Sequence, residues 1–262
     1  MFVPFLLFDF VSAMSEASKA ERVLPTLDRL NAQVPSNLDS KAVLTAWFGL
    51  FAKATQSADT SAISNLFLED ALWRDMLALT WEFRTFDGTK KIIQFLKDTH
   101  PIAKPSNFTL RTNSIELKRP YPDIAWIEAI FDFDITVGKG SGVVHLVPTN
   151  SSGTIWKAYL LYTNLEELKG FPERTGELRD SVPNHGKWPA KRQREIEFLD
   201  VEPAVVIIGA GQSGLETAAR LKLLDVPALV VDRQARIGDQ WRGRYEALCL
   251  HDPVCKCLGM LR

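Results

Sequence analysis

Near its C-terminal end, the 262-residue chain combines an apolar run, a glycine triplet and an acidic residue at fixed spacing. The run Val205–Ile208 is continuously apolar, which is typical of a strand buried on both faces of a parallel sheet. Gly209, Gly211 and Gly214 follow the run directly, and a helical apolar pattern begins after them. A second apolar run ends at Asp232, 21 residues after Gly211. The sequence therefore predicts a strand, a tight glycine turn, a helix and a second strand, in that order.

The glycine turn has the residues that a dinucleotide-binding site requires. Gly209 allows the tight turn, Gly211 lets the backbone approach a pyrophosphate, and Gly214 lets the helix pack close to the strand. The N–H groups at the start of the helix, including those of Gln212 and Ser213, would then meet the pyrophosphate. We therefore predict that these five residues contact a dinucleotide cofactor.

The acid at the end of the second strand supports the same interpretation. Asp232 stands at the interval from which a carboxylate can accept hydrogen bonds from an adenosine ribose. A glycine-rich turn in some other α/β domain would not need this acid. The triplet alone does not separate FAD from NAD. Arg233 could favour a 2′-phosphate, but the neighbouring carboxylate would repel one.

The stretch that follows indicates FAD. Residues Arg236–Tyr245 read RIGDQWRGRY, and residues Leu248–Pro253 read LCLHDP. These segments resemble the second FAD-contacting segment of the flavin-containing monooxygenases, in particular of a fungal branch. That family usually carries two glycines before its tryptophan, and here Asp239 replaces the second of them. The resemblance implies that Trp241 and Tyr245 contact the cofactor, although on the residues alone either could be a core aromatic.

The resemblance implies a reaction as well as a cofactor. In such enzymes NADPH reduces FAD, and a C4a-hydroperoxyflavin transfers oxygen to a small organic substrate. The family also implies a second glycine triplet for NADPH and further strands, which the stretch 204–262 lacks. We therefore expect a truncated Rossmann-type FAD-binding domain here, in a chain that is the inactive N-terminal part of a longer oxidoreductase. No catalytic residue is assigned.

A different pattern precedes this part of the chain. Asp39 or Ser40 can cap a first helix, and a second helical stretch covers about 60–67. The second of the strand-like runs alternates between an apolar and a more polar face, and the glycines at 138–142 indicate a turn. The four predicted runs are Asn107–Lys118, Ile124–Val137, Gly142–Val147 and Thr154–Tyr162. This order predicts an α+β body in which helices cover a curved antiparallel sheet.

Two segments of this body, Leu66–Asp75 and Phe86–Leu96, resemble the nuclear-transport-factor-like cone fold in its SnoaL-type branch. Such cones hold a pocket between their helices and the concave face of the sheet. A buried aspartate in such a pocket could serve as a general base. On the alternative interpretation, the aspartates cap local turns and one histidine is a satisfied core residue. The candidate polar residues are Asp70, Asp75, His100 and His145, of which His145 is the candidate core histidine.

The predicted division has four parts. These are an N-terminal extension at 1–37, the SnoaL-type cone domain at 38–165, a linker at 166–203 and the truncated FAD-binding segment at 204–262. The linker is expected to pack along a domain surface, with Trp188 and Phe198 as anchors. Residues 1–13 read either as a signal-peptide core or as a non-native extension, and their apolar run is too short to span a bilayer.

Charge and cysteine content narrow the class of protein. The net charge of −1 gives no pull toward nucleic acid. The three cysteines lie within the last fourteen residues, so we predict neither a disulfide framework nor a metal site, and a reduced, cytoplasmic compartment. No stable membrane span is predicted. The predicted partners are a small-molecule substrate and, through the cone sheet, a second copy of the chain.

The sequence is compatible with two other functions. The chain could be a non-catalytic binding module built on the cone domain, with a vestigial nucleotide-binding tail. It could also be a small lyase or isomerase that acts in the cone pocket. Bound flavin in the purified protein would contradict the vestigial tail.

Overall fold

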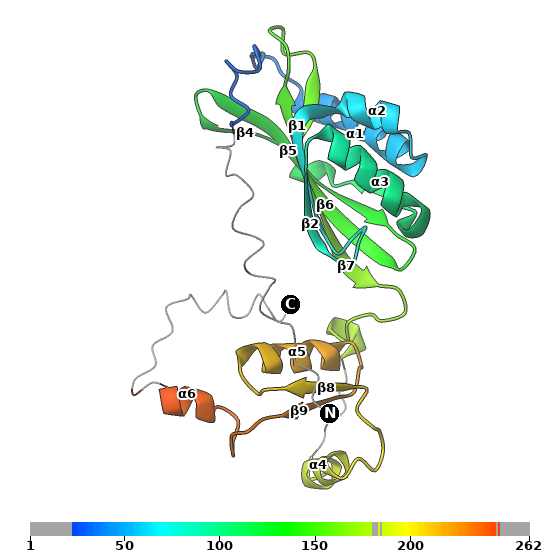
Figure 1. Cartoon of the computed structure of the whole chain (residues 1–262), viewed down its shortest axis with the longest axis vertical. Helices are drawn as coiled ribbons and strands as arrows, with labels where there is room; N and C mark the ends of the chain where they lie inside the picture. The colour runs from blue at the N-terminus through cyan, green and yellow to red at the C-terminus, as the bar shows by residue number, and fades with distance from the viewer. Residues whose placement is uncertain (1–22, 180–182, 184, 245, 247–262) are drawn as a thin grey trace, which may run out of the picture. The chain divides into compact units, whose positions relative to one another are not determined.

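The computed structural model describes residues 23–179, 183, 185–244 and 246 (Figure 1). The chain divides into two units, Met1–Glu166 and Glu167–Arg262. The first unit contains α1 (Ser40–Gln56), α2 (Thr60–Leu66), β1 (Phe67–Met76), β2 (Phe83–Asp87), α3 (Thr89–Ala103), β3 (Ser106–Leu110), β4 (Glu116–Tyr121), β5 (Ile124–Asp134), β6 (Gly138–Pro148) and most of β7 (Trp156–Leu168). The second contains α4 (Trp188–Ile196), β8 (Val205–Ile208), α5 (Gln212–Leu223), β9 (Ala228–Val231) and α6 (Asp239–Arg244).

The first helix begins and packs as its sequence predicts. The Asp39 carboxylate accepts a hydrogen bond from the Ala42 N–H at 3.0 Å, which satisfies one of the free donors at the start of α1. Leu44, Trp47 and Phe51 recur three and four residues apart and are buried. The helix therefore buries one aromatic stripe against the sheet.

The first unit has a seven-stranded sheet in the order β2-β1-β7-β6-β5-β3, with β4 also paired to β5. The helices α1, α2 and α3 lie on one face of this sheet (Figure 1). The predicted α+β class, helices over a curved sheet, is confirmed. One pairing differs from the predicted antiparallel arrangement, because β1 runs parallel to β7. The sequence patterns did not identify β1 and β2 as strands.

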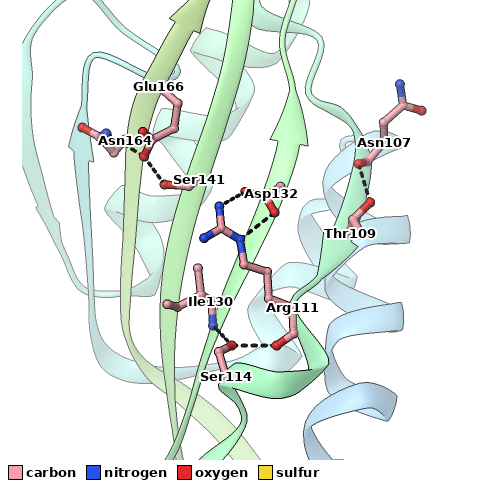
Figure 2. Close-up of polar contacts among 9 residues, drawn as sticks. All are labelled: Asn107, Thr109, Arg111, Ser114, Ile130, Asp132, Ser141, Asn164 and Glu166. Atoms are coloured by element: carbon pink, nitrogen blue, oxygen red, sulfur yellow. Dashed lines mark hydrogen bonds and ion pairs between the residues drawn. The ribbon is translucent and has the colours of Figure 1, made fainter. Parts of the chain in front are cut away.

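Two predicted boundaries inside the sheet are wrong. The run Asn107–Lys118 is two strands, because a 3-10 turn at Thr112–Ser114 separates β3 from β4. The Ser114 hydroxyl fills this gap by accepting a hydrogen bond from the Ile130 N–H at 2.8 Å and donating one to the Arg111 carbonyl at 2.7 Å (Figure 2). The Ser114 side chain thus accepts the hydrogen bond from β5 that a continuous neighbouring strand would have accepted.

The glycines at 138–142 do not form the predicted turn, because they belong to β6. A Cβ at Gly140 would overlap the ring of Phe133, and a Cβ at Gly142 would overlap the ring of Phe131. Glycine is therefore required here for packing, since the aromatic rings of β5 lie directly over the neighbouring strand. Glycine often marks a turn, but in β6 it allows an aromatic side chain of the neighbouring strand to approach the backbone closely.

The core of the first unit follows the two faces predicted for β5. Ile127, Ala129, Phe131 and Phe133 are buried on the helix-facing side, while the residues between them are half-buried. Aromatic rings dominate this core, and the Phe67 ring stacks on Trp73 with centroids 6.1 Å apart. The concave interior that the cone resemblance assigned to a pocket is thus occupied by aromatic rings. The rings are those of Trp47, Phe48, Phe51, Phe67, Trp73, Phe95, Phe108, Phe131 and Phe133.

The described part of the predicted N-terminal extension contacts the cone. The Leu27 N–H donates to the Asp123 carbonyl at 2.8 Å, and Arg29 forms an ion pair with Asp70. Ala32 is buried. Residues from 23 onward therefore pack as part of the first unit, whereas the run 1–13 lies outside the described residues.

The second unit contains a strand–helix–strand arrangement. Strands β8 and β9 are parallel, with Val205 opposite Ala228, and α5 connects them. Among its described residues none is buried, and the side chain of Ile208 is 90% exposed. The apolar run of β8 was expected to be buried on both faces, and that expectation is wrong for this structure. Trp188 and Phe198 are exposed as well, so they are not the predicted anchors.

No helix among the described residues is both long enough and apolar enough to cross a membrane.

Candidate dinucleotide-binding site

The glycine turn between β8 and α5 can be formed only by glycines at two positions. Gly209 has a φ of +107°, a conformation that residues with a Cβ rarely adopt. A Cβ at Gly214 would overlap the Gly209 carbonyl oxygen. The Gly209 N–H donates to the Val231 carbonyl at 2.7 Å and so ties the turn to the end of β9. The first and third glycines therefore have the structural roles that the sequence assigned to them.

Asp232 lies against this turn. Its carboxylate accepts hydrogen bonds from the Ala210 N–H at 2.6 Å and from the Gln234 N–H at 2.7 Å. These bonds, the Ala210 bond first, hold the pKa of Asp232 below its usual range. The Asp232 carboxylate, directly after β9, is thus ionised, exposed and next to the glycine turn.

The start of α5 offers free backbone donors. Gly211 is its N-cap and has no side chain to accept a hydrogen bond from the first turn. The side chain of Gln212 is turned along the helix toward Glu216, at 3.2 Å, and Ser213 is exposed. The backbone groups at this end, with the positive end of the helix dipole, are suited to a phosphate group.

A residue that the sequence interpretation did not select lies over the same turn. The side-chain amide nitrogen of Gln240 would be 2.8 Å from a Cβ built at Gly211. Gln240 stands within the segment that resembles the flavin-containing monooxygenases, but the resemblance pointed to its aromatic residues. Only the fold brings α6 next to the glycine turn.

The remaining predicted cofactor contacts are less informative. Trp241 is half-buried in α6, and Arg233 is exposed beside Asp232, where its charge contributes to the lowered pKa of that carboxyl group. Tyr245 lies outside the described residues, as do the cysteines and the motif that begins at Leu248. These assignments stay predictions.

The candidate residues of the cone pocket are not brought together. Asp70 forms an ion pair with Arg29 on the surface and caps no turn. His100 Nε2 lies 3.0 Å from the Gln56 carbonyl, beside a surface cavity of about 410 Å³ at the ends of α1 and α3. Each residue therefore has a partner of its own, and the two do not form an acid–base pair.

His145 is on the opposite face of the sheet from the helices, because its neighbours Val144 and Leu146 are the core residues of β6. Its Nε2 lies 2.8 Å from a carboxylate oxygen of Glu128, and its ring stacks on Trp126 with centroids 5.0 Å apart. Burial lowers the pKa of His145, against the opposing effect of Glu128. His145 is therefore neither a pocket residue nor a core histidine.

Asp75 is the candidate that the structure buries completely. Its carboxylate accepts hydrogen bonds from the Leu79 N–H at 3.1 Å, the Thr80 N–H at 3.0 Å and the Thr163 hydroxyl at 2.6 Å. The Trp73 indole N–H donates in turn to Thr163 at 2.9 Å. Burial raises the pKa of Asp75, while these hydrogen bonds oppose the rise. The turn-capping interpretation is confirmed for Asp75.

No family model matches this sequence. A stretch of 70 residues, 26% of the chain, is 43% identical to the indole-3-pyruvate monooxygenase YUCCA1 of Oryza sativa subsp. japonica. A stretch of 49 residues, 19% of the chain, is 43% identical to an uncharacterized CzcO-like oxidoreductase of Geobacillus kaustophilus. The chain combines a cone domain with a flavin-monooxygenase-like part. The matched stretches span 16% and 14% of the lengths of these two relatives.

Solved structures show a distant similarity to about half of this chain. A protein of unknown function with a cystatin-like fold, from Nostoc punctiforme, covers 51% of this chain with 96% of its own length, at a TM-score of 0.39 and 13% identity.

Proposed function

We propose that the chain is part of a flavin-dependent monooxygenase and that its second unit binds the adenosine diphosphate half of FAD. The hydrogen bond between the Asp232 carboxylate and the Ala210 N–H carries the proposal. It supports the proposal because one ionised acceptor then lies directly beside the turn that suits a pyrophosphate. The sequence identity with an indole-3-pyruvate monooxygenase and an oxidoreductase supports the same class of enzyme.

The residues of this chain would bind and orient the cofactor. The backbone N–H groups at the start of α5 would bind the pyrophosphate, and Gly211 would allow its close approach. Asp232 would accept hydrogen bonds from the ribose hydroxyls, since an aspartate carboxylate is ionised at neutral pH and the Ala210 and Gln234 N–H groups lower its pKa further. Bound FAD would supply the electron-transfer and oxygen chemistry, with NADPH as the reductant in the complete enzyme.

The substrate and the location of the enzyme are part of the proposal. We propose a small organic substrate and a cytoplasmic location, which the late position of the three cysteines favours. The carboxylate of Asp232 would disfavour a ligand with a 2′-phosphate at this turn. We therefore propose FAD here and assign NADPH to the complete protein.

Titration of the purified full chain with FAD, followed by calorimetry and flavin fluorescence, tests the proposal. We expect one FAD per chain and displacement by ADP. Asp232→Ala should weaken FAD binding by about tenfold, because a hydrogen-bonded charged acceptor is lost. Glu116→Gln, a charge change on β4 in the other unit, is the matched control. A folded chain that binds neither FAD nor ADP would contradict the proposal.

A second function is proposed for the face of the cone sheet opposite the helices, where another copy of the chain would bind. Some charged groups on this face already have hydrogen-bond partners. Arg111 donates to both carboxylate oxygens of Asp132 at 2.8 and 2.6 Å, and Glu166 accepts from the Ser141 hydroxyl at 2.5 Å and from Asn164 at 3.0 Å (Figure 2). Paired charges cost less to bury than isolated ones. Light scattering tests this proposal, and a monomeric chain at high concentration would contradict it.

A further inference from the structure

Two residues of the predicted linker, Glu173 and Arg174, contact the C-terminal end of α5 and are called the strap below. The Arg174 N–H donates to the Leu223 carbonyl at 2.7 Å, which satisfies one of the carbonyls that a helix leaves free at its end. The Arg174 guanidinium forms an ion pair with Asp225, just beyond the helix. The Glu173 carboxylate accepts a hydrogen bond from the Arg220 guanidinium at 3.1 Å. Three polar contacts thus join residues that lie 47 or more positions apart in sequence.

Apolar packing contributes little to this attachment. A surface cavity of about 480 Å³ lies beside the strap, and its lining includes Phe171 and Leu178. The side chains of these two residues are 53% and 56% exposed. Trp188 and Phe198, the aromatic anchors that the sequence predicted, are exposed as well. The linker is therefore held to α5 mainly by charged and backbone groups.

Helix α5 has little apolar packing to fix its direction, because none of its residues is buried. At its N-terminal end the helix packs against the glycine turn, where Gly214 closely approaches the Gly209 carbonyl. At its C-terminal end the strap supplies the contacts, and the positive charges of Arg174 and Arg220 favour the negative end of the helix dipole. The strap thus helps to determine where the first N–H groups of α5 point.

We propose that Glu173 and Arg174 are positioning residues of the dinucleotide site, which hold the C-terminal end of α5 so that its first N–H groups point at the pyrophosphate of the bound cofactor. This inference rests on the proposed function. The helix has 12 residues and is therefore about 18 Å long. Exposed charges are largely screened beyond about 8 Å at physiological salt, so the strap would act through the helix rather than on the ligand directly.

Titration of the full chain with FAD, ADP and adenosine tests this inference. Glu173→Gln and Arg174→Gln each remove one ion pair, and we expect each to weaken FAD and ADP binding by about twofold to fivefold. The variant with both substitutions should bind these ligands more weakly still. Adenosine, which lacks the pyrophosphate, should bind each variant as it binds the unaltered chain. A variant that failed to fold would instead lose all three ligands.

A double-mutant cycle tests whether Glu173 acts through Arg220. Arg220→Gln removes the partner of the Glu173 carboxylate. Once that partner is gone, Glu173→Gln should cause no further loss of FAD affinity, because the ion pair no longer exists. Fully additive losses would contradict the proposed role of the pair. Amide hydrogen exchange should also be faster in the last turn of α5 when the strap is altered.

The matched control is Glu195→Gln, which removes an exposed ion pair with Arg192 on α4 in the same unit. It should leave FAD and ADP affinity unchanged. If the strap variants bind both ligands as the unaltered chain does, while Asp232→Ala binds less well, this inference is overturned and the proposed function stands. If the unaltered chain binds neither ligand, both are overturned. Equal losses for adenosine and ADP would also contradict positioning through α5.

Discussion

The two units of the chain differ in how their apolar residues are used. In the cone, the side chains of Phe51, Ile127 and Leu146 are at most 1% exposed, and helices cover the sheet. In the strand–helix–strand unit, Val206 is 57% exposed and Ile208 is 90% exposed. A short parallel pair with one helix cannot cover both of its faces. The comparison shows that the glycine turn can form through local contacts, whereas a hydrophobic core requires many elements.

The largest expected effect is on the cone core. Phe51→Ala should lower the free energy of unfolding by about 3–5 kcal/mol, because it removes a buried ring in contact with several others. Ile208→Ala should change it by no more than about 0.5 kcal/mol, since the side chain is already exposed. Chemical denaturation followed by circular dichroism measures both. Equal effects would mean that the contrast between the units is wrong.

A second prediction concerns the buried carboxylate. Asp75→Asn should lower the free energy of unfolding by about 1–3 kcal/mol, because its new N–H₂ group would face donors rather than acceptors. Asp70→Asn is the matched control, and its exposed ion pair should be worth about 0–1 kcal/mol. If the two substitutions have the same effect, the buried network does not stabilise the cone.

The free energy of unfolding should depend on pH through the buried Asp75 carboxyl group. Because burial raises the pKa of Asp75 above its ordinary value of 3.8, the native state binds its proton more tightly than the unfolded state. The stabilisation of the native state by protonated Asp75 is therefore fully present below pH 3.8. It is lost as the pH rises through the raised pKa. Denaturation at a series of acidic pH values should show this fall for the unaltered chain. Asp75→Asn should lack it, and an identical slope in both would contradict the assignment.

The last prediction compares two glycines, one in the cone and one in the glycine turn. Gly142→Ala should lower the free energy of unfolding of the cone by about 1–3 kcal/mol, because a Cβ would overlap the Phe131 ring. Gly214→Ala should leave cone unfolding unchanged while FAD binding is lost, because its Cβ would overlap the turn itself. Denaturation and FAD titration of both variants separate these outcomes. If Gly142→Ala lost FAD binding and Gly214→Ala kept it, the assignment of FAD binding to the glycine turn would be contradicted.

Some of the fold could be predicted because the determining contacts are local. The Asp39 cap, the 3-4 apolar spacing of α1 and the alternation of β5 are all set by residues close in sequence. The strands β1 and β2 were missed, because their residues become strands through pairing with each other and with β7. Pairing between residues almost ninety positions apart, such as Trp73 with Leu161, leaves no local signal.

The candidate site divides in the same way. Gly209, Gly214 and Asp232 could be predicted, since a strand–turn–helix–strand unit fixes their spacing. Gln240 could not, because its position over Gly211 depends on how α6 folds back toward the turn. The prediction for His145 was also wrong, because it placed the side chain on the helix-covered face of the sheet. A histidine among apolar residues of a strand can point to either side of the sheet.

The sequence by itself determined the order of the two units, the glycine turn with its acid, and the two faces of β5. The tertiary structure alone decided that β1 and β7 are parallel and that Asp75 is buried and hydrogen-bonded to the turn that follows β1. It also decided that Gly140 and Gly142 make room for aromatic rings. The physical reason is the range of the interactions. Backbone conformation and capping depend on neighbours in sequence, whereas burial, hydrogen-bond partners and ring packing depend on residues that only folding brings together.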